Sequence, residues 1–172
     1  MPVVSGSSGR GVASSLAPLM GMQYLELESR RFPDGEGYVR VPTEAIDAVR
    51  SEPVVLVSNT YPDSGIVSTL LLLEAIADVR RGDLSNLKGE EPQSMDDVGG
   101  GVFLAIPYYG YSRQDKRFSK GEAISARVIA EILARGCDGI AILDLHEPAV
   151  LEGMDVPIEF VSSMPEIAEL LQ

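Results

Sequence analysis

Short apolar runs rich in β-branched residues alternate along this chain with longer segments of helical periodicity. The runs at residues 54–58 and 102–106 are almost unbroken, and a third follows at residues 139–145. Strands that are apolar on both faces are typical of parallel sheets, in which a crossover helix joins each strand to the next. The alternation therefore predicts an α/β fold with a mainly parallel sheet flanked by helices.

Cap and turn signals place the helices between these runs. A first helix is expected to end at Met20, and Asp63 is a suitable N-cap for another that ends at Gly82. Residues 119–122 have the S-x-x-E spacing of a capping box, which predicts a further helix from there to Arg135. Additional strands are expected at residues 2–5, 22–27 and 37–41.

Size and charge limit the class of protein. A chain of 172 residues, 45% of them hydrophobic, buries one sizeable core, so a single domain is expected. Its formal net charge of -12 repels nucleic acid and anionic membranes, and neither is expected as a partner. One cysteine and the absence of a charged leader favour a cytoplasmic location. Residues 83–101 are polar, acidic and rich in glycine, which predicts a flexible loop.

A basic cluster stands out against this acidic background. Five of the fourteen basic residues lie within fifteen positions, and they are Arg113, Lys116, Arg117, Lys120 and Arg127. The contrast favours a small phosphorylated ligand with a metal ion. The only histidine, His146, follows the third buried run, and ligands of open parallel sheets bind outside the carboxyl ends of the strands. The basic cluster and His146 are therefore expected at one edge of the sheet, although a solvated basic face and a structural histidine fit the same pattern.

Four segments occur in a recognisable order: RFPDGE (31–36), PYYGYSRQDKRF (107–118), GEAISARVIAEIL (121–133), and LDLHE with MDVPIEF (143–160). Together they resemble the N-terminal half of ribose-phosphate pyrophosphokinase, and the wording KRFSKGEAIS is most similar to the archaeal branch. The resemblance implies a phosphoribosyltransferase-like topology in which residues 1–172 form the N-terminal, ATP-side domain. The second domain of the family, which contains the ribose-phosphate loop, is absent from this sequence.

The resemblance also implies a reaction and a set of ligands. The family transfers a diphosphoryl group from ATP to ribose 5-phosphate, releases AMP, and requires Mg²⁺. Carried over by position, Arg113 and Gln114 would contact ATP, while His146 would meet the metal and the phosphates, with Asp144 orienting its ring. No residue of this chain receives a catalytic role.

The corner at residues 32–36 would bind the adenine. The resemblance implies that Phe32 stacks on the base, that Asp34 and Glu36 accept from its amino edge, and that Gly35 belongs to the same turn. In the family a neighbouring subunit lends this corner, so a homo-oligomer is expected, or a partner that supplies the second domain. The isolated chain is expected to be inactive or weakly active. The alternative is a non-catalytic subunit that regulates or assembles an active synthetase.

Overall fold

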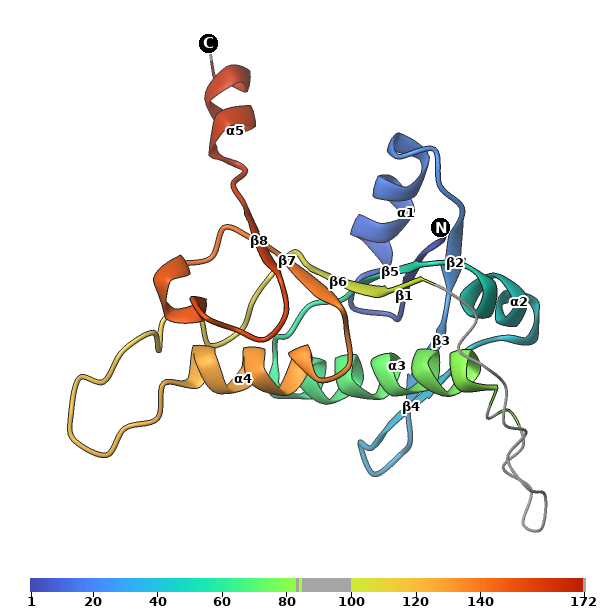
Figure 1. Ribbon diagram of the computed structural model, residues 1–172, viewed down its shortest axis with the longest axis horizontal. Coiled ribbons are helices and arrows are strands. Elements are labelled where there is room, and N and C mark those ends of the chain that lie inside the picture. The colour runs from blue at the N-terminus through green and yellow to red at the C-terminus, as the bar shows by residue number, and fades with distance from the viewer. Residues whose placement is uncertain (83, 85–99, 172) are drawn as a thin grey trace.

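The computed structural model describes residues 1–82, 84 and 100–171. Its centre is a six-stranded parallel sheet in the order β2-β1-β5-β6-β7-β8 (Figure 1). The strands of this sheet are β1 Val3–Ser5, β2 Tyr24–Glu26, β5 Val54–Val57, β6 Val102–Ile106, β7 Gly139–Leu143 and β8 Ile158–Val161. A separate antiparallel pair is formed by β3 (Glu28–Arg31) and β4 (Gly37–Arg40). The predicted α/β class with a mainly parallel sheet is confirmed.

Helices cover the two faces of the sheet unequally. They are α1 Arg10–Leu19, α2 Thr43–Ser51, α3 Asp63–Arg81, α4 Ser125–Ala134, α5 Met164–Leu170 and the short 3₁₀ helix η1 Pro148–Leu151. Helices α3 and α4 lie on one face, and α1 lies on the other (Figure 1). Helix α1 packs against β1, β2 and β5, so it covers only the half of that sheet face that these three strands form.

Two cores explain why the sheet strands are apolar on both faces. Neighbouring residues of a strand point to opposite sides. Leu56 of β5 is buried with Leu72 and Leu104 in the larger core, on the side of α3. The next residue, Val57, is buried with Ala13 in the smaller core beneath α1. The unbroken apolar run at residues 54–57 therefore reflects burial on both sides.

The expected helix at residues 119–135 begins later than its cap signal indicates. Glu122 does accept a hydrogen bond from the Ser119 N–H, at 2.9 Å, as a capping box requires. However, Gly121 has a φ of +89°, in the left-handed region that an α-helix does not use. Residues 119–122 therefore close a turn, and α4 begins at Ser125.

Other element boundaries also differ from expectation. Residues 22–27 do not form one continuous strand, because pairing with β1 ends at Glu26 and the buried Leu27 separates β2 from the β3–β4 hairpin. Helix α3 begins at Asp63 and ends before Gly82 as predicted, but the Asp63 side chain does not cap it. Helix α2 has no counterpart in the sequence prediction.

The expected flexible loop at residues 83–101 lies outside the described residues, apart from Leu84, Gly100 and Gly101. In the part of the chain that the structure describes, no helix is long and apolar enough to cross a membrane.

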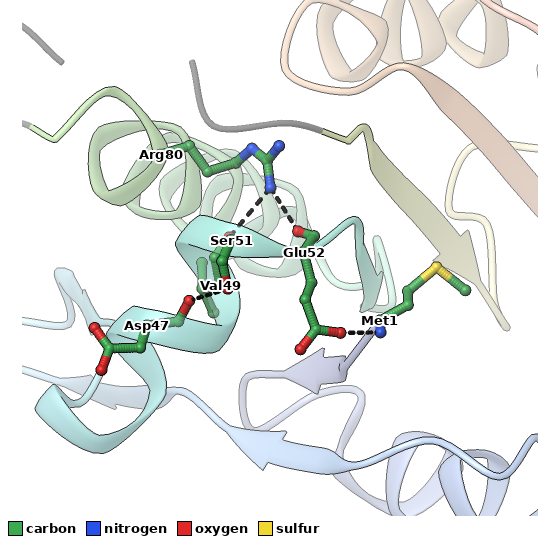
Figure 2. A network of polar contacts seen from close by, with 6 residues as sticks. All are labelled: Met1, Asp47, Val49, Ser51, Glu52 and Arg80. Carbon is green, nitrogen blue, oxygen red and sulfur yellow. Dashed lines mark hydrogen bonds and ion pairs between the residues drawn. The ribbon is translucent and has the colours of Figure 1, made fainter. Parts of the chain in front are cut away.

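A buried arginine joins α3 to the end of α2. Arg80 is 5% exposed and donates hydrogen bonds to the carbonyl oxygens of Val49 at 3.1 Å and Glu52 at 2.7 Å (Figure 2). It also donates to the carbonyl oxygen of Gly100. The last carbonyls of a helix have no donor within the helix. The guanidinium therefore caps the carboxyl end of α2 from a neighbouring helix.

Candidate functional site

The carboxyl ends of β1, β5, β6 and β7 lie along one edge of the sheet, because these strands are parallel neighbours. The segments that leave this edge are residues 6–9, 58–62, 107–124 and 144–147. Ligands of open parallel sheets bind at such an edge. The candidate site is therefore built from these four segments.

Asn59 links three of the four segments. Its Nδ2 donates to the Ser8 carbonyl oxygen at 2.7 Å, and its Oδ1 accepts from the Tyr108 N–H at 2.9 Å. The hydroxyl oxygens of Ser8 and Ser58 lie 3.2 Å apart beside it. A single amide that satisfies two backbone groups fixes the spacing of the loops. Sequence reasoning missed this residue, and the signal for it is the polar S-N-T triplet directly after an apolar strand.

Thr60 anchors the start of segment 107–124. Its buried Oγ1 accepts from the Gly110 N–H at 2.7 Å, and its own N–H donates to the Tyr108 carbonyl oxygen at 3.1 Å. A Cβ at Gly110 would lie 2.4 Å from the Thr60 carbonyl oxygen, so this approach requires glycine. On the other side, the buried Tyr109 donates its hydroxyl to the Ala126 carbonyl oxygen at 2.6 Å. This tyrosine therefore packs in the core and ties the loop to α4.

The two other tyrosines near the start of this segment, Tyr108 and Tyr111, are exposed. Tyr108 is exposed and makes an edge-to-face contact with Tyr61, with ring centroids 5.7 Å apart. Tyr111 has a φ of +64°, and its hydroxyl donates to Asp63 Oδ1 at 2.7 Å. That hydrogen bond raises the pKa of Tyr111 and uses the carboxylate that was expected to cap α3.

The basic cluster divides into two groups. The Arg117 side chain donates to a backbone carbonyl at 2.8 Å, and Arg127 pairs with Glu131 at 2.9 Å. In the described part of the chain, no ion pair is formed by the other three, which are Arg113, Lys116 and Lys120. These three exposed cations make segment 107–124 locally attractive to an anion in a chain that is acidic overall.

The predicted ligands Arg113, Gln114 and His146 come to the same edge of the sheet. The first two follow β6 and the third follows β7, and these strands are adjacent and parallel. The Gln114 carbonyl oxygen accepts from the Ala126 N–H at 3.3 Å, which ties this part of the loop to the first turn of α4. The Arg113 and His146 side chains are both exposed, so a ligand outside the sheet can reach them.

Asp144 has a different partner from the one expected. Its Oδ1 accepts from the Ser163 N–H at 2.9 Å, and its Oδ2 accepts from the Ser163 hydroxyl. These hydrogen bonds, the hydroxyl one first, lower the pKa of the Asp144 carboxyl. Among the described residues, Asp144 is not hydrogen-bonded to His146, so this carboxylate holds the end of β8 rather than the imidazole.

The remaining predicted residues lie at the tip of the β3–β4 hairpin. The Phe32 N–H donates to the Glu36 carbonyl oxygen at 2.8 Å, and Asp34 Oδ1 accepts from the Glu36 N–H at 3.1 Å. Gly35, with a φ of +94°, completes the tight turn that the Pro-Asp-Gly sequence predicts. The Phe32 ring is 40% exposed and meets Tyr38 edge to face, with centroids 5.8 Å apart.

This hairpin tip is separate from the edge of the sheet. Figure 1 shows the hairpin projecting past α3, whereas segment 107–124 extends from the end of the sheet beside α4. No hydrogen bond or ion pair between described residues joins the tip to segment 107–124 or to His146. Within one chain, the predicted residues therefore form two groups.

The chain is similar to known proteins both in its sequence and in its fold. Residues 100–136 match the family described as the N-terminal domain of ribose phosphate pyrophosphokinase. The ribose-phosphate pyrophosphokinase of Methanothermobacter thermautotrophicus is 38% identical over 170 residues, which cover 97% of this chain and 52% of the relative. That of Methanobrevibacter smithii is 34% identical over 171 residues, with 98% and 50% covered. The chain thus spans about half the length of the curated relatives that it matches.

A solved structure has the same architecture. The crystal structure of phosphoribosylpyrophosphate synthetase from Mycobacterium smegmatis matches with a TM-score of 0.73 at 20% identity, and the match covers 98% of this chain and 50% of the other. This likeness confirms the expected topology. In its sequence the chain is thus similar to ribose-phosphate pyrophosphokinases, with residues 100–136 matching their N-terminal domain, and in its fold it is similar to half of a phosphoribosylpyrophosphate synthetase.

Proposed function

We propose that this chain is the ATP-binding half of a ribose-phosphate pyrophosphokinase. Together with a second half, it would transfer diphosphate from ATP to ribose 5-phosphate and give phosphoribosyl diphosphate and AMP. The observation that supports this most is the pairing of exposed cations after β6 with an exposed imidazole after β7, at the ligand-binding edge of a parallel sheet. The name shared by the relatives supplies the reaction.

The triphosphate would lie between segment 107–124 and His146. The Arg113 guanidinium can direct two parallel donors at phosphate oxygens, a geometry that lysine does not offer. Gln114 would contact ATP next to it. Transfer between phosphate groups depends mainly on positioning and on neutralising charge, and exposed cations on a fixed loop suit that task.

Magnesium would reach this site with the nucleotide. Mg²⁺ usually binds through one or two protein groups together with substrate phosphates and water. The described residues contain no group of three or more His, Cys, Asp or Glu side chains that could hold a metal ion. In this proposal His146 meets the metal and the phosphates, and bound magnesium neutralises the phosphate charge.

The adenine would be bound by the hairpin tip of a second copy. Phe32 offers an exposed aromatic face, and the nearby carboxylates of Asp34 and Glu36 are acceptors suited to an adenine amino group. Gly35 gives the turn its shape. Because the tip is not joined to the sheet edge within one chain, a homo-oligomer that brings the two together is part of the proposal. We also propose that the protein is cytoplasmic and that this chain alone has weak or no turnover.

Isothermal titration with Mg-ATP tests this proposal. Arg113→Ala should weaken binding about 10- to 100-fold, since a hydrogen bond to a charged group contributes about 1.5–3 kcal/mol. Arg135→Ala is the matched control, because it removes the same charge from an exposed arginine next to the carboxyl end of α4. An unmodified chain that does not bind nucleotide, or equal losses in the two variants, would refute the proposal. A non-catalytic assembly subunit predicts that Arg113→Ala changes neither nucleotide affinity nor partner binding.

A further inference from the structure

One face of the β3–β4 hairpin has a continuous row of charged and aromatic side chains. In the antiparallel register, Arg30 lies directly opposite Tyr38. The preceding pair on the same face is Glu28 with Arg40. Opposed residues of an antiparallel pair share a face, and so do residues two positions apart along a strand. Phe32 therefore continues this row to the tip of the hairpin, where its ring is exposed.

The Arg30 guanidinium contacts two aromatic rings at once. Its Cζ atom lies 4.2 Å from the centroid of the Tyr38 ring and 4.9 Å from that of the Phe32 ring. Both distances are within the range of about 6 Å in which a ring face attracts a cation. The two rings also meet edge to face. The three side chains therefore form one cluster, which the sequence motifs did not indicate because Arg30 lies outside the RFPDGE segment.

A carboxylate holds this cation from the base of the hairpin. Glu28 Oε1 accepts from Arg30 Nε at 3.4 Å, and Glu28 Oε2 accepts from Arg40 Nε at 2.8 Å. The hydrogen bond from Arg40 is the main reason that the pKa of Glu28 is lowered, so this carboxylate is charged at neutral pH. Arg30 is thus held between an anion and two rings.

The position of Arg30 affects how Phe32 presents its ring. Within the described chain, the cation–π and aromatic contacts of this ring are those with Arg30 and Tyr38. A cation over one face of the ring leaves the opposite face for a planar ligand. A ring that is already held in place loses less conformational freedom when a ligand stacks on it, so the ligand binds more tightly.

We propose that Arg30 is a positioning residue for the base of the nucleotide. It holds the Phe32 ring, from the face that the base does not use, in the orientation in which adenine stacks on it. Arg30 thus acts through Phe32 and not through a contact of its own with ATP. This inference rests on the proposed function, in which the hairpin tip binds adenine. The alternative is that Arg30 is one more positive charge that attracts the phosphates.

Isothermal titration with two ligands distinguishes these roles. Mg-tripolyphosphate has a chain of three phosphates like that of ATP, but no base. Arg30→Met removes the cation and keeps most of the side-chain length. It should weaken Mg-ATP binding about fivefold, the effect of one exposed cation–π contact, and leave Mg-tripolyphosphate binding unchanged. Arg30→Lys keeps a cation and should recover part of the loss.

Arg40→Met is the matched control for Arg30→Met. It removes the same charge from the same row of the hairpin, and the Arg40 side chain is 52% exposed against 51% for Arg30. In the part of the chain that the structure describes, Arg40 makes no cation–π contact with Phe32. The control should therefore bind Mg-ATP as tightly as the unmodified chain.

The outcomes of the titrations separate this inference from the proposed function. Equal losses of Mg-ATP and Mg-tripolyphosphate affinity in Arg30→Met would overturn the inference, because Arg30 would then act through its charge. Arg113→Ala should weaken both ligands. If Arg113→Ala lowers the affinity for Mg-ATP and Arg30→Met does not, only the role of Arg30 is refuted. If the unmodified chain binds neither ligand, the proposed function is refuted and this inference with it.

NMR of the free chain tests the cluster without any nucleotide. The ring currents of Phe32 and Tyr38 should shift the side-chain proton signals of Arg30 upfield, and Phe32→Leu should reduce that shift. Signals of Arg30 at the positions of a solvated arginine would refute the cluster, and with it the proposal, whatever the chain binds.

Discussion

Arg80→Met is expected to destabilise the fold strongly without changing any residue that is proposed to bind nucleotide. Methionine keeps most of the aliphatic length of the side chain but removes every donor. The carbonyl oxygens of Val49 and Glu52 (Figure 2) and that of Gly100 then lose the guanidinium that joins α2, α3 and the start of β6. The two helices would still pack, but the carboxyl end of α2 would have no cap from α3.

The size of this effect follows from the burial of the guanidinium. A hydrogen bond from a charged donor contributes about 1.5–3 kcal/mol, and a buried polar group left without a partner costs about 1–3 kcal/mol. The guanidinium also has a desolvation cost that methionine does not have, so the separate values do not add. We expect a loss of about 3 kcal/mol in the free energy of unfolding. In a domain of this size, that lowers the melting temperature by about 6–12 °C.

Urea unfolding and calorimetry measure this loss, and Arg81→Met is the control. Arg81 is the next residue of α3, but its side chain is 56% exposed and pairs with Glu74 and Asp78 at the surface. Solvent screens such pairs, so the control should lose no more than about 1 kcal/mol. If the two variants unfolded at the same urea concentration, the stabilising role given to Arg80 would be wrong.

Three further predictions concern other contacts. Thr60→Val leaves the Gly110 N–H without its acceptor, so it should lower the free energy of unfolding by about 1–3 kcal/mol in urea titrations, and an unchanged midpoint would contradict this. The pKa of Asp144 is lowered by Ser163, so its stabilising effect is present above the ordinary value of 3.8 and is lost as the pH falls. Ser163→Ala should therefore be less stable than the unmodified chain at pH 7, with a difference that narrows toward pH 3; a constant difference would count against this pair. Burial raises the pKa of Cys137 to about 11, so iodoacetamide should label the folded chain slowly at pH 8 and the urea-unfolded chain quickly.

The central strands could be predicted because each is a short apolar run that is visible in the sequence itself. The runs at residues 54–57, 102–106 and 139–143 are apolar at nearly every position, a pattern that is typical of strands in a parallel sheet. Helix α2 was missed because its apolar signal is weak, with Ala45 and Val49 as its only buried residues. The start of α4 was misplaced because the capping-box pattern at residues 119–122 also fits a turn once glycine adopts a positive φ.

The candidate site could be predicted only where position along a strand decides the geometry. Arg113 and His146 come to one edge because they follow adjacent parallel strands. The contacts that fix this edge join distant parts of the chain. Asn59 pairs with residues 51 and 49 positions away, and Thr60 with one 50 positions away. No local pattern in a single sequence indicates such partners.

The most direct measurement is the NMR signal of the single histidine in the presence of ATP and Mn²⁺. His146 is the only histidine of the chain, so its ring protons are identified without assignment of other residues. If imidazole and guanidinium bind one metal-triphosphate group, Mn-ATP should broaden these signals, and Arg113→Ala should abolish the effect at the same concentration. Sharp His146 signals in a chain that titration shows to be saturated with Mn-ATP would mean that the nucleotide binds elsewhere.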